Sequence, residues 1–484
     1  MGRDVEADRY FKHHFEQFSA RLEAETELLQ QWFTQGGLAE EGGSIGFELE
    51  GWLISPRGEP TPLNQHFLQQ VRQLDCTPEL SRFNIEINSP PIPPSPRLLT
   101  ELQQQLEQRW SLCQETAGRL GVGLIMIGTL PTLRTEMLTL ETMSQPGRYH
   151  ALNRELMRLR RGAPFQFHLH GEEQLSFYHP DVMLEAATTS LQIHLQTPFA
   201  LGSATYNALL LASGPVVAVA ANSPLLFGRR LWQESRIPLF EQAVAVGGLK
   251  DGGVSPMGRV TFGSGFVRSS VYELFVENRE HYLPLLPAEL APDPQKMEHL
   301  SLHNGTIWRW NRPIIGFASN GQPHLRFEHR TLPAGPTPVD SVANIAFLLG
   351  LVAALTAKLV RGEVLLSFAQ ARDNFYGAAR LGLDAHLQWQ GGEQGRAGDL
   401  LPRLLPLAAD GLRRMGLLEA DIATYLDIIA ARIATGQNGA NWQLRQLTRI
   451  EQRQRDPQQA GSELVQRYFQ WQESGQAVHQ WEIE

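Results

Sequence analysis

The sequence predicts an α+β fold in which an antiparallel sheet with one polar face is followed by a block of helices. Between residues 45 and 331, short segments of alternating polarity are interspersed with longer segments of helical periodicity. After Pro338 the periodicity is helical to the end of the chain. We therefore expect an N-terminal helical arm (residues 1–43), an α+β core (44–338) and a C-terminal helical region (339–484).

The composition is that of a globular protein with a mildly acidic surface. The 484 residues include 42 Lys and Arg against 51 Asp and Glu, a net charge of −9. Because no basic run is present, we do not expect a nucleic-acid partner. The two cysteines, Cys76 and Cys113, exclude a disulfide framework, and the charged first 19 residues do not resemble a signal peptide. These features favour a reducing compartment, and we expect the cytoplasm.

The helical arm and the C-terminal region are predicted from their periodicity. Residues 9–34 carry apolar side chains at helical spacing. The run from Val342 to Val360 is nearly long enough to span a bilayer and has no charge before Lys358. Because Asn344 and several small residues interrupt its hydrophobicity, we expect a buried core helix and no membrane partner. Helices are expected near 339–360, 362–381, 399–416, 418–435 and 459–472, with 391–398 as a flexible connector.

Four short segments within the core carry the most informative pattern. Each alternates apolar and polar residues, so each is predicted to be a strand with one polar face. The segments are Gly46–Gly51, Phe83–Asn88, Leu191–Gln196 and Leu325–Arg330. Their polar positions include four glutamates, two arginines, a histidine and a glutamine, namely Glu48, Glu50, Glu86, Glu328, Arg326, Arg330, His194 and Gln192.

These polar faces differ from an ordinary solvated sheet surface. They contain no lysine, and Glu48 and Glu50 lie on one face of the same strand, where like charges repel each other. Divalent cations would neutralise the repulsion, and hard carboxylate ligands suit Mg²⁺ or Mn²⁺. Arginines among the acids indicate a polyanionic substrate, a combination typical of phosphoryl transfer. Since the chain has no G-x-x-x-x-G-K loop, a nucleotide would have to be held by metals on the sheet.

The strand segments described above, together with several other motifs of the chain, follow one another in the order found in the glutamate–cysteine ligase family, which they resemble. This family belongs to the glutamine synthetase-like superfamily. The likeness is to its plant and bacterial type-2 carboxylate–amine ligase branch and covers residues 44–445. The motifs are Gly46–Glu50, Pro78–Leu80 with Glu86–Pro90, Thr189–His194, Ala221–Pro224 with Gly228 and Ser235–Arg236, and Arg326–Arg330. The turn Gly436–Ala440 resembles a further element near the end of that branch.

The resemblance implies a glutamine synthetase-like antiparallel sheet with one polar catalytic face and helices on the other face. It also implies roles for particular residues. The metal ligands would be Glu48, Glu50, Glu79, Glu86, His194 and Glu328. Gln192 is a second candidate metal ligand on the strand of His194, and either residue can be the ligand from that strand. Gln192 and Arg326 would contact the nucleotide cofactor. Arg330 would stabilise the transferring phosphoryl group, and Arg236, with Asn222, would hold a substrate carboxylate.

The function implied is that of an ATP-dependent carboxylate–amine ligase using Mg²⁺ or Mn²⁺. The γ-carboxylate of glutamate would be activated as an acyl phosphate and attacked by an amino-acid amine. The sequence does not specify the amine substrate or the oligomeric state. Two alternatives are a metal-dependent amidohydrolase on the same scaffold and a degenerate, non-catalytic binding protein. A binding protein would have no need to keep the mutually repelling glutamates, whereas release of ADP would separate a ligase from an amidohydrolase.

Overall fold

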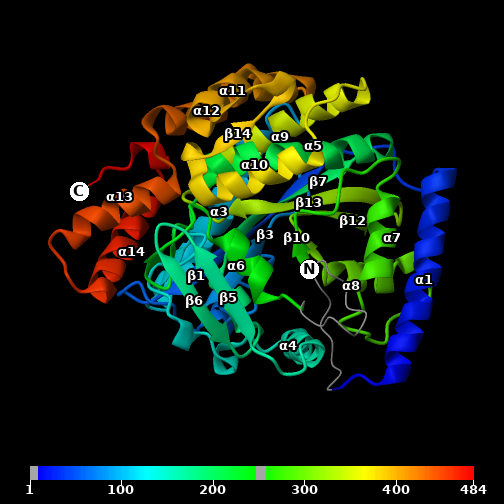
Figure 1. Cartoon of the computed structure of the whole chain (residues 1–484), viewed down its shortest axis with the longest axis horizontal. Coiled ribbons are helices and arrows are strands. Elements are labelled where there is room, and N and C mark those ends of the chain that lie inside the picture. The colour runs from blue at the N-terminus through cyan, green and yellow to red at the C-terminus, as the bar shows by residue number, and fades with distance from the viewer. Residues whose placement is uncertain (1–8, 247–257, 484) are drawn as a thin grey trace.

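The computed structural model describes residues 9–246 and 258–483. At the N-terminal end, helix α1 (Lys12–Gln35) packs against α7 (Tyr272–His281) and α8 (Glu298–Gly305). The buried carboxylate of Glu25 fastens α1 to α8, because it accepts hydrogen bonds from the ring of His299 (2.6 Å) and the backbone N–H of Leu300 (2.7 Å). The predicted N-terminal helix is thus present and lies along one edge of the molecule (Figure 1).

The centre of the protein is an antiparallel sheet with the strand order β12-β13-β7-β1-β3-β2, and β4 pairs with β1. The predicted segments fall in four neighbouring strands, β13, β7, β1 and β3, which confirms the predicted sheet. The strand bounds are β1 Ile45–Ile54, β2 Cys76–Pro78, β3 Asn84–Asn88, β4 Gly123–Ile125, β7 Ser190–Thr197, β12 Asn311–Phe317 and β13 Pro323–Pro333.

The apolar face of this sheet forms the core of the protein. Phe47, Leu49, Ile85, Ile193 and Phe327 are each at most 1% exposed. Helix α5 (Gly202–Ala220) packs on β13 and against α9 (Pro338–Val360), while α3 (Leu98–Arg119) packs on β4 and α9. Figure 1 shows α5 and α9 on one side of the sheet and α8 on the other. The polar face is therefore turned away from the large helices and toward the α8 side.

Smaller elements surround the sheet. The remaining helices of the core are α2 Asn64–Gln70, α4 Gly147–Leu159 and α6 Arg236–Ala243, with a 3-10 helix η3 at Val182–Ala187. Short strand pairs are β5 Phe165–His170 with β6 Gln174–His179, β8 Leu225–Leu226 with β9 Arg229–Arg230, and β10 Val260–Thr261 with β11 Trp308–Arg309.

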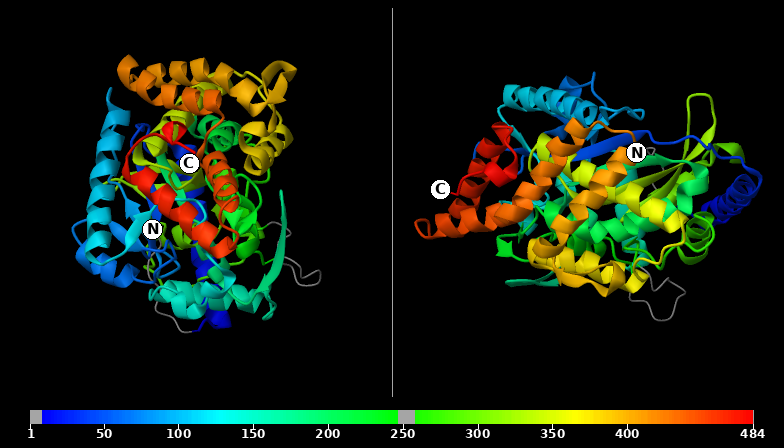
Figure 2. Two further views of the ribbon diagram at one scale, coloured as in Figure 1. Left: turned by 90° about the vertical axis from the view of Figure 1, so that its left-hand side faces the viewer. Right: turned by 90° about the horizontal axis from the view of Figure 1, so that it is seen from above.

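The C-terminal region is helical, with three departures from the prediction. Its helices are α9, α10 Phe368–Leu381, α11 Ala397–Arg414, α12 Glu419–Thr435, α13 Gly439–Glu451 and α14 Pro457–Glu473, and α13 and α14 lie at the end of the molecule opposite α1 (Figure 2). Helix α10 begins later than predicted because the Ser367 side chain caps it. The expected connector 391–398 instead contributes to the hairpin of β14 (His386–Gln388) and β15 (Gln394–Arg396) and to the start of α11.

Helix α13 was not predicted. The turn that precedes it supplies its N-cap, because the Asn438 side chain accepts a hydrogen bond from the backbone N–H of Asn441 (2.9 Å). The segments Phe199–Ala220 and Pro338–Val360 are long and apolar enough to cross a membrane, but 83% and 78% of their apolar windows are buried inside the protein. The run from Val342 to Val360 is therefore a core helix, as the sequence predicted. The division into arm, core and helical region stays a prediction.

We expect Gly411→Ala to destabilise the protein, because the backbones of α9 and α11 touch at this point. A Cβ at Gly411 would lie 1.8 Å from the carbonyl oxygen of Gly350, so the helices would have to separate. The expected loss is about 1–3 kcal/mol of unfolding free energy, measured by urea denaturation. The matched control is Gly377→Ala in α10, where a Cβ would meet no atom closer than 4.0 Å. The control should be neutral or stabilising, and equal stability of the two variants would contradict the close helix contact.

Candidate active site

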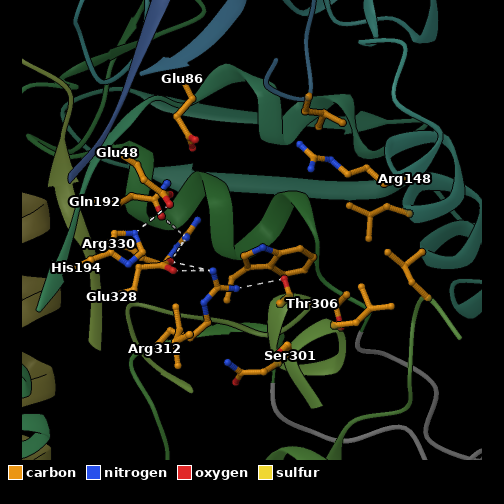
Figure 3. Close-up of a pocket in the computed structure, with 18 of the residues that line it drawn as sticks. Glu48, Glu86, Arg148, Gln192, His194, Ser301, Thr306, Arg312, Glu328 and Arg330 are labelled. Carbon is orange, nitrogen blue, oxygen red and sulfur yellow. Dashed lines mark hydrogen bonds and ion pairs between the residues drawn. The ribbon is translucent and has the colours of Figure 1, made fainter. Parts of the chain in front are cut away.

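The polar face of the sheet forms one wall of a cavity of about 510 Å³ (Figure 3). Except for Arg236 and Asn222, all of the predicted site residues line it: Glu48, Glu50, Glu79, Glu86, Gln192, His194, Arg326, Glu328 and Arg330. They come from four neighbouring strands and from the turn after β2. The opposite wall includes residues of α8 and of the loop before it, among them Lys296, Leu300 and Ser301.

The strand register brings these side chains together. Glu50 on β1 stands opposite Glu86 on β3, and Glu48 stands opposite Gln192 on β7. On the next pair of strands, β7 and β13, His194 stands opposite Glu328. Because directly paired residues have Cβ atoms about 5 Å apart, each pair shares one patch of the sheet. Segments far apart in the sequence thus supply one continuous polar surface.

At one end of the cavity is a group of three carboxylates, Glu50, Glu79 and Glu86, which we call the acidic group. Each offers an oxygen, and these oxygens all lie within 4.8 Å of one another. Burial raises the pKa of Glu50 to about 7, and the charge of Glu79 adds to the rise. Burial and then the charge of Glu48 raise the pKa of Glu86 well above its usual range. Such a group is suited to hold a divalent cation, which would replace the protons that the carboxylates otherwise retain.

Glu50 is the most firmly held member of the acidic group. Its oxygens accept hydrogen bonds from the backbone N–H and the hydroxyl of Ser190, both at 2.8 Å, and from the side chain of Gln192 at 3.0 Å. These bonds fix the orientation of the carboxylate. A weaker contact at 3.3 Å joins the Thr77 hydroxyl to Glu86.

The other end of the sheet wall is basic. The Glu328 carboxylate accepts hydrogen bonds from Arg312, at 2.8 and 3.0 Å, and from Arg330. Burial opposes ionisation of Glu328, but the two guanidinium charges hold its pKa well below the usual range. Nearby, His194 Nε2 lies 3.0 Å from Glu48, and this contact outweighs burial and lowers the pKa of Glu48.

Gln192 and Arg330 connect the two ends. The amide of Gln192 donates to Glu50, and its carbonyl oxygen accepts from the guanidinium of Arg330, which also binds Glu328. Figure 3 shows this chain of contacts running from Gln192 through Arg330 and Glu328 to Arg312. Burial disfavours the charge on Arg330, but the nearby glutamates, first Glu328, raise its pKa. Arg330 therefore stays charged beside the acidic group.

Arg326 shares the cavity but not the network. Its guanidinium has no hydrogen-bond partner among residues 9–246 and 258–483, and burial lowers its pKa. A partly buried guanidinium that makes no hydrogen bond to the described residues is available to bind an anionic group of a substrate.

Arg236 and Asn222 are not brought to the cavity. Arg236 is 2% exposed, and its guanidinium is taken up by Glu234 at 3.2 Å and by the carbonyl oxygen of Thr331 at 2.6 Å. The amide of Asn222 donates to the carbonyl oxygen of Ala334 and to the hydroxyl of Tyr468, both at 2.8 Å. Both side chains form their hydrogen bonds within the protein, so in this geometry they support the structure around β13.

Sequence reasoning missed five charged residues of the cavity, namely Arg148, Glu185, Lys296, Glu298 and Arg312. Arg312 lies on β12, which has no acidic residue to draw attention to it. Arg148 begins α4 and reaches the cavity only through the fold. Glu185 did leave a signal, since it is the single charged residue in the apolar segment Val182–Ala187.

Comparisons with known proteins agree with the fold. The model of glutamate–cysteine ligase family 2 matches residues 44–468. No curated protein matches the chain. Among solved structures, a glutamate–cysteine ligase (gshA) from Francisella tularensis in complex with AMP is 10% identical, with a TM-score of 0.51 and coverage of 93% of this chain and 91% of that one. A bifunctional glutathione synthetase from Pasteurella multocida is 11% identical, with a TM-score of 0.46 and coverage of 92% and 54%.

We expect Mn²⁺ to raise the Tm of the metal-free protein, because the cation relieves repulsion within the acidic group of the folded state alone. At about 100 times the Kd, the gain is about 2.7 kcal/mol. Glu86→Gln should remove most of this gain while raising the Tm of the metal-free protein, since it removes a buried acid that must take up a proton on folding. The control is Glu172→Gln, at an exposed position outside the cavity. An unchanged Mn²⁺ effect in Glu86→Gln would contradict a cation site here.

Proposed function

Because the chain belongs to glutamate–cysteine ligase family 2 and is an ATP-dependent carbon–nitrogen ligase, we propose that it joins the γ-carboxylate of glutamate to an amino-acid amine. The carboxylate would be activated as an acyl phosphate before the amine attacks. The observation that carries this proposal is the position of Arg330, which lies beside the acidic group and lines the same cavity. A cluster of carboxylates that can hold cations, next to a fixed guanidinium, suits the transfer of a phosphoryl group.

The cations would be held by the acidic group, with Glu48, His194 and Glu328 as further proposed ligands. Bound Mg²⁺ or Mn²⁺ would neutralise the ATP phosphates and align them with the acceptor carboxylate. Arg330 would contact the phosphoryl group during transfer. Arg326, which forms no hydrogen bond within the described residues, would bind another anionic group of the nucleotide or of the acid.

The proposed reaction has two steps. In the first, a γ-carboxylate oxygen of glutamate attacks the γ-phosphorus of ATP, and ADP leaves with the electrons of the broken P–O bond. In the second, the amine nitrogen attacks the acyl carbon, and inorganic phosphate leaves with the electrons of the broken C–O bond. The protein contributes by aligning the reactants and stabilising charge, because no step requires a covalent bond to a side chain.

Release of ADP tests the proposal. The chain is incubated with Mg²⁺, ATP, L-glutamate and one amino acid at a time, and ADP and the amide product are quantified. We expect ADP and product in equal amounts for at least one amine, and no product when glutamate is replaced by 2-aminobutyrate, which lacks the γ-carboxylate. Amide hydrolysis without ADP would favour the amidohydrolase alternative. Absence of turnover with every pair would contradict the proposal.

We expect Arg330→Lys to lower kcat by about 100-fold or more while the KM for ATP changes only a few-fold. Lysine keeps the charge but loses the planar fork of donors, and negative charge on the phosphoryl group is greatest during transfer. The measurement is kcat per folded molecule, with the Tm recorded in parallel. If Arg330 served only as the ion-pair partner of Glu328, the Tm would fall and the folded fraction would keep near-normal turnover.

A further inference from the structure

Glu185 occupies a rigidly held part of the cavity wall. It belongs to the 3-10 helix η3, which is tied down at both ends. Before Glu185, the side chain of Asp181 accepts from the backbone N–H of Met183 (3.0 Å), and Asn153 accepts from that of Val182 (3.1 Å). After it, the Thr188 hydroxyl donates to the carbonyl oxygen of Glu185 (3.0 Å). The position of this side chain is therefore set by the fold.

The surroundings of Glu185 are unusual for a carboxylate that serves structure alone. The other side chains of η3 are at most 3% exposed and apolar. Glu185 lines the cavity beside Val182, Phe240 and Val244, and its carboxylate has no hydrogen-bond partner among residues 9–246 and 258–483. It also lies outside the acidic group, whose oxygens are within 4.8 Å of one another.

Burial and the charged residues around Glu185 determine the pKa of its carboxylate. Burial raises its pKa to about 8, the negative charges of Glu79 and Glu50 add to the rise, and Arg330 opposes it. A carboxylate of this kind exchanges its proton near neutral pH, as a general base must. A carboxylate without a hydrogen-bond partner on an apolar wall also attracts a cationic substrate group that can lose its charge by giving up a proton.

We propose that Glu185 is a catalytic residue, the base that accepts a proton from the attacking amine. This inference rests on the proposed function. The amine arrives as an ammonium ion, and its pairing with Glu185 places the nitrogen in the cavity that Arg330 and the acidic group share. Transfer of one proton to the carboxylate frees the lone pair, which forms the C–N bond as the C–O bond to phosphate breaks. The second proton of the nitrogen leaves with the departing phosphate, so the amide is neutral.

The experiment compares two nucleophiles in the full-length chain with ATP, Mg²⁺ and L-glutamate. One is L-cysteine, which is an ammonium ion at neutral pH, and the other is hydroxylamine, which is already unprotonated there and traps the acyl phosphate as a hydroxamate. For Glu185→Gln we expect ligation of cysteine to fall about 100-fold or more and hydroxamate formation to stay within about threefold of the unmodified protein. Glu185→Asp should recover part of the ligation rate, and the exposed control Glu172→Gln should behave as the unmodified protein.

Other outcomes separate this inference from the proposed function. If the unmodified protein forms neither hydroxamate nor ADP, the proposed function itself fails. If it forms both, but Glu185→Gln lowers both reactions equally, Glu185 acts in phosphoryl transfer and the inference is overturned. Loss of the Mn²⁺-dependent rise in Tm in Glu185→Gln would place Glu185 among the cation ligands and overturn it as well. Unchanged ligation of cysteine would have the same consequence.

Discussion

Repulsion between carboxylates is the constraint around which this protein is arranged. Glu50, Glu79 and Glu86 place oxygens within 4.8 Å of one another, on a wall where burial makes each negative charge more costly. Without a cation the group must retain protons. Such a site persists only if the backbone holds the three side chains in place, which explains why two of them lie on directly paired strands.

The rest of the fold supplies that stiffness. The apolar face of the sheet is covered by α5, which packs on α9, which in turn packs on α11. The α9–α11 contact is so close that Gly350 and Gly411 approach backbone to backbone. Arg236 binds the carbonyl oxygen of Thr331 in β13, and Asn222 binds that of Ala334 directly after this strand. Helices that resist displacement keep the strands of the site in register.

Charge is distributed along the sheet wall so that each end suits a different chemical group. Glu328 neutralises part of the charge of Arg312 and Arg330, leaving them ordered without a ligand. Gln192 joins Arg330 to Glu50, so hydrogen bonds connect the acidic and basic ends. A substrate that carries both phosphates and cations would meet complementary charge at both ends. This charge pattern is compatible with the phosphoryl transfer that we propose.

The sequence by itself determined the strands and their polar faces, because alternation in Glu48–Glu50 or Glu328–Arg330 is a property of the extended backbone. It also determined the core helix α9 and the family resemblance. Tertiary structure alone decided which charged groups meet. Arg236 belongs to a family-like motif, yet Glu234 and backbone carbonyls engage it, whereas Glu185 reaches the cavity from a segment without strand periodicity. Pairing between distant segments and competition among hydrogen-bond partners depend on three-dimensional proximity, which local sequence patterns do not encode.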